Sequence, residues 1–255
     1  MRGLSKKWFC GRAFFALVAV LCNLQLLTLH AQNAGDMWGV NSANEIYRWS
    51  GTGWQKIPGE LKYVSIGTDG SVWGVNSSDQ IFQWTGTQFR LVPNGSLKQI
   101  AVRTRTELWG VNSADQIFRS SGAREGWTRV EGSLKYVSVG ADGSVWGVNS
   151  ADEIYRWSGN AFTRVANGEL KLLSVAIGND VWGINSQNQI FRRSRSGWER
   201  LPGELKEIAA GPNGTAWGVN SRDEIYRWTH SGFQLVPNGE LKQIAIRKTR
   251  SVRFD

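Results

Sequence analysis

The sequence predicts an all-β protein, a six-bladed β-propeller with four antiparallel strands in each blade. Three observations predict this fold. One phrase of about 36 residues recurs six times, each copy divides into four short runs typical of strands, and the two ends of the repeated region hold complementary parts of one copy. The chain has 255 residues, a length compatible with one large β domain.

The repeat is marked by a Trp-Gly step and a Leu-Lys step. The Trp-Gly step recurs every 35 to 37 residues and begins at Trp38, Trp73, Trp109, Trp146, Trp182 and Trp217. The Leu-Lys step begins at Leu61, Leu97, Leu134, Leu170, Leu205 and Leu241. Six copies therefore fill residues 36–255, and we expect a single propeller domain over residues 32–255.

Each copy reads as four short strands joined by turns. Residues 134–167 are an example, with the runs "LKYVSVG", "SVWGVNS", "EIYRWSG" and "FTRVANG". These runs are rich in Val, Ile, Tyr and Trp, and Gly, Asn, Asp and Ser separate them. No stretch after the leader has the periodicity of a helix. Four strands in a repeat of this length are typical of a propeller blade.

The ends of the repeated region predict how the ring closes. The first copy enters at its second strand, "DMWGV", and lacks a first strand. The last residues, "LKQIAIRKTRS", form a first strand with no successor. We therefore expect the C-terminal strand to complete the first blade. An open solenoid is the alternative, but it would need capping repeats, and the sequence shows none.

Residues 1–31 have the layout of a secretory signal peptide. A start containing Arg2, Lys6, Lys7 and Arg12 precedes an apolar run over residues 13–29 and a small residue, Ala31. An uncleaved membrane anchor is the alternative, but the run is short for a span and contains Asn23 and Gln25. We expect a secreted, extracellular protein, or a periplasmic one if the source is bacterial, with no stable membrane insertion after cleavage.

Removal of this leader changes the charge and the cysteine content. The net charge is +9, from 30 basic and 21 acidic residues. Without the four basic residues of the leader, 26 basic residues remain and the net charge is +5. Both cysteines, Cys10 and Cys22, also lie in the leader. The mature protein would then have no disulfide, so its stability must come from packing and backbone pairing.

The Trp-Gly step has a structural interpretation. Neighbouring residues of a strand point to opposite faces, so Trp146 and Val148 share one face and Gly147 leaves a dent in the other. We expect each Trp to fill the dent over the Gly of a neighbouring blade. The functional alternative is that some of these Trp side chains are partly exposed between blades and stack on a sugar ring.

The repeated words "WGVNS…IYRW…G…W…V.G.LK.VSVG" resemble tectonin repeats, as in tectonin, the tachylectin-1-like lectins and the fish-egg lectins. The resemblance covers all six copies, although the fifth copy reads "WGINS" with Ile184. It implies a six-bladed propeller that binds glycans, and from the residues themselves we expect no enzymatic activity. The implied function is that of a secreted multivalent lectin that binds glycans such as O-methylated sugars or lipopolysaccharide, in defence or agglutination.

The candidate glycan-binding residues are the six Trp of the Trp-Gly step and the six Asn that follow them. The Asn residues are Asn41, Asn76, Asn112, Asn149, Asn185 and Asn220. Their turns are expected at the same end of the propeller as the blade-to-blade crossings, which contain Glu60, Glu169, Glu204 and Glu240. Asn offers a donor and an acceptor, as a sugar hydroxyl does. The structural alternative is that Asn serves the turn itself.

The copies alternate in a way that predicts two classes of inter-blade site. The aromatic residue opening the fourth strand is, in order, Trp54, Phe89, Trp127, Phe162, Trp198 and Phe233. Copies two, four and six also insert Asn94, Asn167 and Asn238 before the crossing Gly. Copies three and five have Ser120 and Arg193 where the others have a third-strand Trp. The unit of duplication is therefore a pair of blades, with pseudo-threefold symmetry.

An enzyme and an interaction scaffold are the other function classes. Catalysis needs an off-symmetry cluster such as a carboxylate pair or a His base, whereas the acidic residues recur in register and the only His after the leader is His230. We expect no cofactor and no metal. The basic segments at residues 103–106 and 247–253 would suit a scaffold for proteins or anionic polymers. The expected partners are cell-surface glycans and lipopolysaccharide, not nucleic acid, and we expect a monomer.

Overall fold

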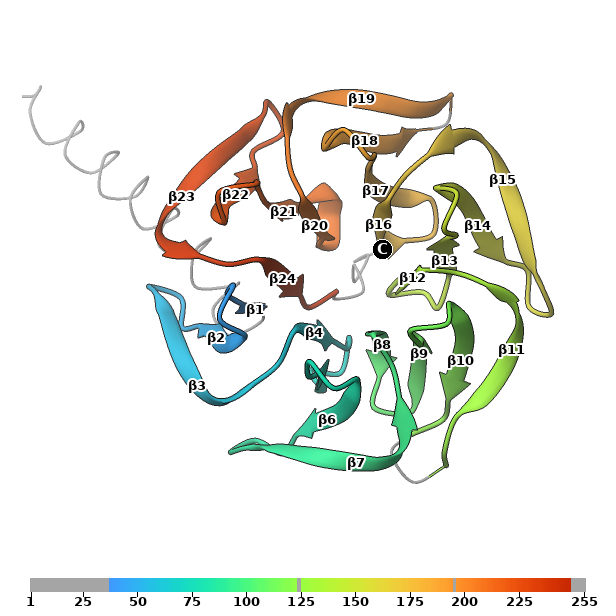
Figure 1. Ribbon diagram of the computed structural model, residues 1–255. Helices are drawn as coiled ribbons and strands as arrows, with labels where there is room; N and C mark the ends of the chain where they lie inside the picture. Colours follow the sequence, from blue (N-terminus) through green and yellow to red (C-terminus); the bar gives the residue numbers. More distant parts are fainter. Residues whose placement is uncertain (1–36, 123–124, 195, 249–255) are drawn as a thin grey trace, which may run out of the picture.

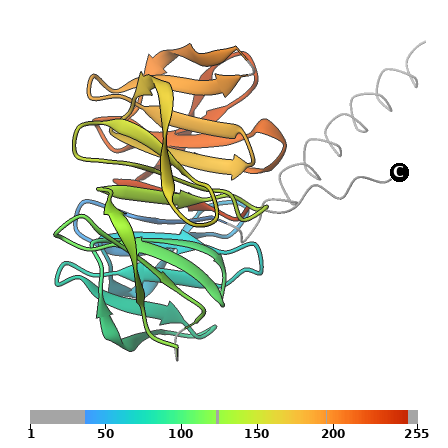
Figure 2. The ribbon, with the colours of Figure 1, turned by 90° about the vertical axis from the view of Figure 1, so that its right-hand side faces the viewer.

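Six four-stranded sheets surround a central axis in the computed structural model, which describes residues 37–122, 125–194 and 196–248 (Figure 1). Seen from the side, the sheets form a disc with turns on both flat ends (Figure 2). The six-bladed, four-stranded propeller is thus confirmed. The predicted signal peptide, residues 1–31, lies outside the described residues.

Blades are numbered from 1 to 6 in chain order, with strands given from the axis outward. Blade 1 contains β24 (Gln243–Ile246), β1 (Met37–Val40), β2 (Glu45–Trp49) and β3 (Trp54–Glu60). Blade 2 contains β4 (Tyr63–Ile66), β5 (Val72–Val75), β6 (Gln80–Trp84) and β7 (Phe89–Ser96). Blade 3 contains β8 (Gln99–Thr104), β9 (Glu107–Val111), β10 (Gln116–Ser120) and β11 (Thr128–Ser133).

The second half of the chain repeats this arrangement. Blade 4 contains β12 (Tyr136–Val139), β13 (Val145–Val148), β14 (Glu153–Trp157) and β15 (Phe162–Glu169). Blade 5 contains β16 (Leu172–Ile177), β17 (Asp180–Ile184), β18 (Gln189–Ser194) and β19 (Gly197–Glu204). Blade 6 contains β20 (Glu207–Ala210), β21 (Ala216–Val219), β22 (Glu224–Trp228) and β23 (Phe233–Glu240), with a 3₁₀ turn, η1 (Pro212–Gly214), after β20.

The ring is closed by the C-terminal strand, as the sequence predicts. Strand β24 pairs antiparallel with β1, with Met37 opposite Ile246 and Val40 opposite Gln243. It occupies the innermost position of blade 1 (Figure 1). The two ends of the repeated region therefore share one sheet, and the backbone groups of β1 find partners on both sides.

The dent over each Trp-Gly glycine is filled by a leucine, not by a tryptophan. A Cβ placed on Gly147 would lie 2.5 Å from Leu134 Cδ1 and 2.8 Å from the carbonyl oxygen of Tyr136. The same contact joins Gly39 to Leu241, Gly74 to Leu61, Gly110 to Leu97, Gly183 to Leu170 and Gly218 to Leu205. The expectation of a Trp over a neighbour's Gly is wrong, because the Leu just before the inner strand of the same blade already occupies that space.

The Trp side chains instead pack into the seams, the contacts between neighbouring blades. In seams 1/2, 3/4 and 5/6 the Trp of the Trp-Gly step lies edge to face with a third-strand Trp and a fourth-strand Phe of the next blade. The distances between ring centroids are 5.2–6.1 Å. The trios are Trp38 with Trp84 and Phe89, Trp109 with Trp157 and Phe162, and Trp182 with Trp228 and Phe233. Such pairs contribute about 0.5–1.5 kcal/mol each beyond burial.

The other three seams are built differently. A fourth-strand Trp lies against the crossing Gly of the preceding blade, so that a Cβ on that Gly would lie 2.6–2.7 Å from the indole. The pairs are Trp127 with Gly95, Trp198 with Gly168 and Trp54 with Gly239. The inserted Asn94, Asn167 and Asn238 adopt φ values of 63–65° before these glycines. The described seams therefore alternate, with the pseudo-threefold pattern that the sequence predicts.

The inner strands are joined across the axis and around it. The hydroxyls of Tyr63 and Tyr136 lie 2.7 Å apart, and Lys248 Nζ donates to the carbonyl oxygen of Val139 at 2.7 Å. An enclosed cavity of about 40 Å³ remains between these strands. Glu207 lines it and is 9% exposed. Burial raises the pKa of this carboxyl group to about 8, so it is largely protonated at neutral pH.

The Leu–Gly contact predicts the effect of adding one methyl group. Gly147→Ala should lower the free energy of unfolding by about 1–3 kcal/mol, because the new Cβ would meet both Leu134 and a backbone carbonyl. Gly53→Ala is the matched control, since a Cβ at Gly53 meets no atom within 4 Å. Urea denaturation of both variants measures the difference. Equal losses of unfolding free energy in Gly147→Ala and Gly53→Ala would show that the Leu134–Gly147 contact does not limit stability.

Glu207 predicts a pH-dependent stability. Its pKa is about 8 in the folded protein, against an ordinary value of 4.5. Unfolding therefore releases a proton between these pH values, and stability falls as the pH rises from 4.5 to 8. Glu207→Gln should remove this loss and gain about 3–5 kcal/mol relative to wild type on going from pH 4 to pH 8. Denaturant titrations at both pH values measure it. The expectation is refuted if the free energies of unfolding of wild type and Glu207→Gln differ by the same amount at pH 4 and at pH 8.

Candidate functional site

The six candidate Asn residues organise the turns between the second and third strands. Asn41 Oδ1 accepts hydrogen bonds from the backbone N–H groups of Ala43 and Glu45, at 3.0 and 2.9 Å, and its Nδ2 donates to the Glu45 carboxylate at 2.7 Å. The amides of Asn149 and Asn220 make the same bonds. Those of Asn76, Asn112 and Asn185 make equivalent bonds in which Nδ2 donates to the side-chain oxygen of a Gln. A glycan at these positions would have to compete with bonds inside the turn.

A Glu–Tyr pair reinforces three of these turns. Tyr47 donates its hydroxyl to the Glu45 carboxylate at 3.0 Å, and Tyr155 with Glu153 and Tyr226 with Glu224 do the same. The hydrogen bond from Lys56, with those from Asn41 and Tyr47, lowers the pKa of Glu45 to about 2. The other three copies have Phe in place of Tyr and Gln in place of Glu, so their turns lack the phenol–carboxylate hydrogen bond.

The turns and the crossings meet at one end of the propeller, as expected. Each Lys of the Leu-Lys step bonds to the residue in the fourth position of the turn in the same blade. Four of these partners are Asp, in the pairs Lys62–Asp79, Lys98–Asp115, Lys135–Asp152 and Lys206–Asp223. Lys171 and Lys242 bond to Asn188 and Asn44 instead. The repeated acidic residues of these turns are therefore held in structural ion pairs.

The six candidate Trp side chains are buried, with exposed fractions of 0–7%. Trp217 and Trp109, at 7% and 5%, are the most exposed of them, and each reaches the floor of an outer cleft in a seam. Each of them also packs in a cluster with side chains of the next blade. A ligand could therefore touch these two Trp residues at an edge, while Trp38, Trp73, Trp146 and Trp182 offer it almost no surface in this structure.

The cleft in seam 3/4 has a volume of about 460 Å³. Trp109, Arg119 and Ser120 line it from blade 3, and Trp157 and Gly143 line it from blade 4. Its walls combine two Trp side chains with charged and hydroxyl groups. This lining can hold a polar ring against an apolar floor.

The cleft in seam 6/1 is larger, about 580 Å³, and more apolar. Trp217, Arg227 and Leu235 line it from blade 6, and Met37 and Trp49 line it from blade 1. Leu235 is 55% exposed. The seam that closes the ring thus presents an apolar surface beside a guanidinium group.

A third-strand arginine packed on an indole is a feature of the seams that the sequence interpretation missed. The guanidinium carbons of Arg48, Arg156, Arg192 and Arg227 lie 4.8–5.8 Å from the ring centroid of the Trp in the adjacent strand. A guanidinium over an indole at this distance is a cation–π contact. The signal was present in the sequence, since five of the six copies place Arg at this position and only the second has Gln, at Gln83.

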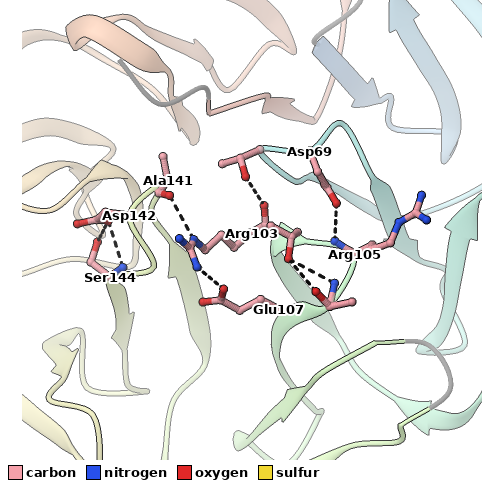
Figure 3. Close-up of polar contacts among 10 residues, drawn as sticks. Asp69, Arg103, Arg105, Glu107, Ala141, Asp142 and Ser144 are labelled. Carbon is pink, nitrogen blue, oxygen red and sulfur yellow. Dashed lines mark hydrogen bonds and ion pairs between the residues drawn. The ribbon is translucent and has the colours of Figure 1, made fainter. Parts of the chain in front are cut away.

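The opposite end of the propeller uses the predicted basic segment for structure (Figure 3). Arg103 forms an ion pair with Glu107, and its Nε donates to the carbonyl oxygen of Ala141 in the next blade at 3.2 Å. The backbone N–H of Arg105 donates to Asp69 at 2.8 Å, while its side chain is exposed. Arg247 Nε likewise donates to the Thr68 carbonyl at 3.1 Å. Residues 249–253 of the second basic segment lie outside the described residues.

The described residues contain neither a cluster that could bind a metal ion nor a helix that could cross a membrane. No group of three or more His, Cys, Asp or Glu side chains in that part of the chain could hold a metal ion. Within the same residues, no helix has the length and apolar character needed to cross a membrane. His230 lies in an outer turn with a φ of 70°.

Comparison with known structures shows the propeller fold alone. The β-propeller domain of Cps50 (Swd1) from Myceliophteria thermophila superimposes with a TM-score of 0.59 and 11% identity, over 85% of this chain and 91% of that one. Prp20p from Saccharomyces cerevisiae gives 0.57 and 9%, over 80% and 76%. YCF48 bound to D1 peptide gives 0.54 and 15%, over 80% and 82%.

Comparison of sequences identifies the family. Tectonin-1 from Physarum polycephalum is 49% identical over 37 residues, which is 14% of this chain and 17% of that protein. The match therefore spans about one sixth of Tectonin-1. The Tectonin domain family matches the chain over residues 25–126, 121–178 and 169–253. These matches extend across all six blades, and the chain belongs to the tectonin family.

Proposed function

We propose that this protein is a secreted, multivalent lectin whose binding sites are the outer clefts between blades. The observation that carries the proposal is the cleft in seam 6/1, where Trp217, Trp49 and the exposed Leu235 form an apolar surface beside Arg227. A sugar ring has an apolar face and a rim of hydroxyls, so it needs this combination of aromatic surface and hydrogen-bonding groups.

The two clefts suit different parts of a glycan. The apolar lining of seam 6/1 fits a substituent such as the methyl group of an O-methylated sugar. The cleft in seam 3/4 has Arg119, Ser120 and Glu125 on its walls, and it fits a hydroxyl-rich or phosphorylated saccharide such as the core of lipopolysaccharide. Membership of the tectonin family supports both assignments.

Several weak sites on one rigid ring would suit agglutination. When one site binds a cell surface, the others are held near further glycans at high effective concentration. The two classes of seam imply that fewer than six sites are equivalent. The signal-peptide layout of residues 1–31 supports a place outside the cell, where such glycans are exposed.

The first test is a glycan array that includes methylated sugars and lipopolysaccharide-core saccharides, followed by variants at seam 6/1. Leu235→Glu should weaken the binding of a methylated monosaccharide at least tenfold, because a charge would replace the apolar wall. Leu91→Glu is the control, since Leu91 is 49% exposed at the matching position of β7 and lines neither cleft. Equal affinities for both variants would exclude seam 6/1 as the site.

Stoichiometry gives a separate prediction. Titration calorimetry with a monosaccharide that binds should show fewer than six equal sites for each chain, because the seams alternate between two classes with different side chains. The protein concentration is checked independently by Trp absorbance. Six equal sites would show that the alternation of the seams does not affect binding.

A further inference from the structure

Seam 4/5 differs from the other seams in its charge. Blade 5 has Arg193 where four other blades have a third-strand Trp. The guanidinium carbon of Arg193 lies 5.0 Å from the ring centroid of Trp146 in blade 4. Arg156, also in blade 4, places its guanidinium carbon 5.4 Å from the same centroid. Two cationic groups from facing blades therefore share one indole.

Neither guanidinium is neutralised within the part of the chain that the structure describes. No ion pair forms there at Arg156 or Arg193, whereas Arg192 pairs with Asp180 at 3.1 Å. The Nε of Arg193 is buried and has no hydrogen-bond partner. A buried, unpaired donor on a charged group costs free energy, so an acceptor bound by this guanidinium would offset a cost that the fold already carries.

The strand pairing directs the nearest carboxylates away from this pair. In blade 5, Arg193 is opposite Trp198 and Arg192 is opposite Glu199, so Glu199 stands on the other face of the sheet from Arg193. In blade 4, Glu153 is three residues from Arg156 in β14 and also faces the other side, where it pairs with Arg164 at 3.0 Å. Arg193 also lines a cleft of about 620 Å³ that contains Asp180, Arg192 and Glu199. Asp180 pairs there with Arg192, and among the described residues neither carboxylate forms an ion pair with Arg193.

We propose that Arg156 and Arg193 bind the anionic group of an acidic saccharide in seam 4/5. Guanidinium groups bind carboxylate, sulfate and phosphate through paired, charge-assisted hydrogen bonds. The two guanidinium carbons cannot be farther apart than the sum of their distances to the Trp146 centroid, so one sugar residue that carries an anionic group is large enough to contact both. The saccharide part of this inference rests on the proposed lectin function, while the anion-binding part rests on the arginines alone.

A purely structural role makes a different prediction. If Arg193 only filled the volume that Trp occupies in other blades, an uncharged side chain of similar length would replace it without loss of any ligand. Arg193→Met tests this, because Met is long, flexible and apolar. Arg193→Lys keeps the positive charge but loses the planar donor pair.

The experiment is titration calorimetry of the full chain with methyl β-D-glucuronide and its neutral counterpart, methyl β-D-glucoside. Wild type should bind the glucuronide at least tenfold more tightly, and added salt should reduce this preference. Arg193→Met and Arg156→Met should abolish it, and Arg193→Lys should retain part of it. Glucose 6-phosphate and glucose 6-sulfate, compared in the same way, identify which anionic group is preferred.

Arg48→Met is the matched control. Arg48 lies 5.7 Å from the ring centroid of Trp38 in seam 1/2, where Trp84 stands in place of Arg193, and its loss should leave the preference unchanged. Thermal unfolding of each variant shows that the fold is retained. The proposal is overturned if a folded Arg193→Met variant keeps the wild-type preference for the glucuronide. It is also overturned if wild type shows no such preference.

The results that would exclude the general lectin function differ from those that would exclude the anion site. If no neutral glycan binds at any seam but the glucuronide preference persists and depends on Arg193, the anion site stands and the general lectin assignment falls. If neutral glycans bind at the other clefts and the glucuronide is not preferred, the lectin assignment stands and the site in seam 4/5 is refuted.

Discussion

The contact of a crossing leucine with the backbone of the second strand is the constraint on which the propeller depends. Leu134 lies where the Cβ of Gly147 would be, and all six copies repeat this arrangement. The Leu lies two residues before the inner strand, so the contact fixes the end of each crossing against the blade that it enters. Because the glycine face is filled from within the blade, the neighbouring Trp points across the seam to the next blade.

This division of roles explains why the third-strand position can vary. In seams 1/2, 3/4 and 5/6 a Trp there completes an aromatic trio, but in blades 3 and 5 the position holds Ser120 and Arg193. Those two blades keep their Leu–Gly contact, and each has a fourth-strand Trp packed on the crossing glycine of the preceding blade. Stability therefore comes from elements that repeat, and the third strand is free to change its chemistry from seam to seam.

The sequence predicted the architecture more accurately than it predicted the side-chain contacts. Spacing, turn residues and the complementary ends gave six blades, four strands in each and closure by β24, because these depend on local patterns. The partner of Gly147 was missed, since strand alternation says which face has a dent but not whether Leu134 or a distant Trp reaches it first. The candidate Trp and Asn were chosen by repetition, which here marks buried packing and turn bonds, whereas Arg156 and its counterparts were overlooked beside the more conspicuous Trp.

Departures from the repeat are where chemistry that is not structural can accumulate. At the residue after the Leu-Lys step, Gln99 and Gln243 bridge to the backbone of the next blade, while Leu172 has no amide and Glu207 is a buried carboxyl group in the same ring of positions. Glu207 and Arg193 each replace a residue that its counterparts use for packing or bonding. A repeat protein tolerates such a cost at one blade because the other blades hold the ring closed, so the residues that break the pattern, rather than those that form it, distinguish one seam from the next.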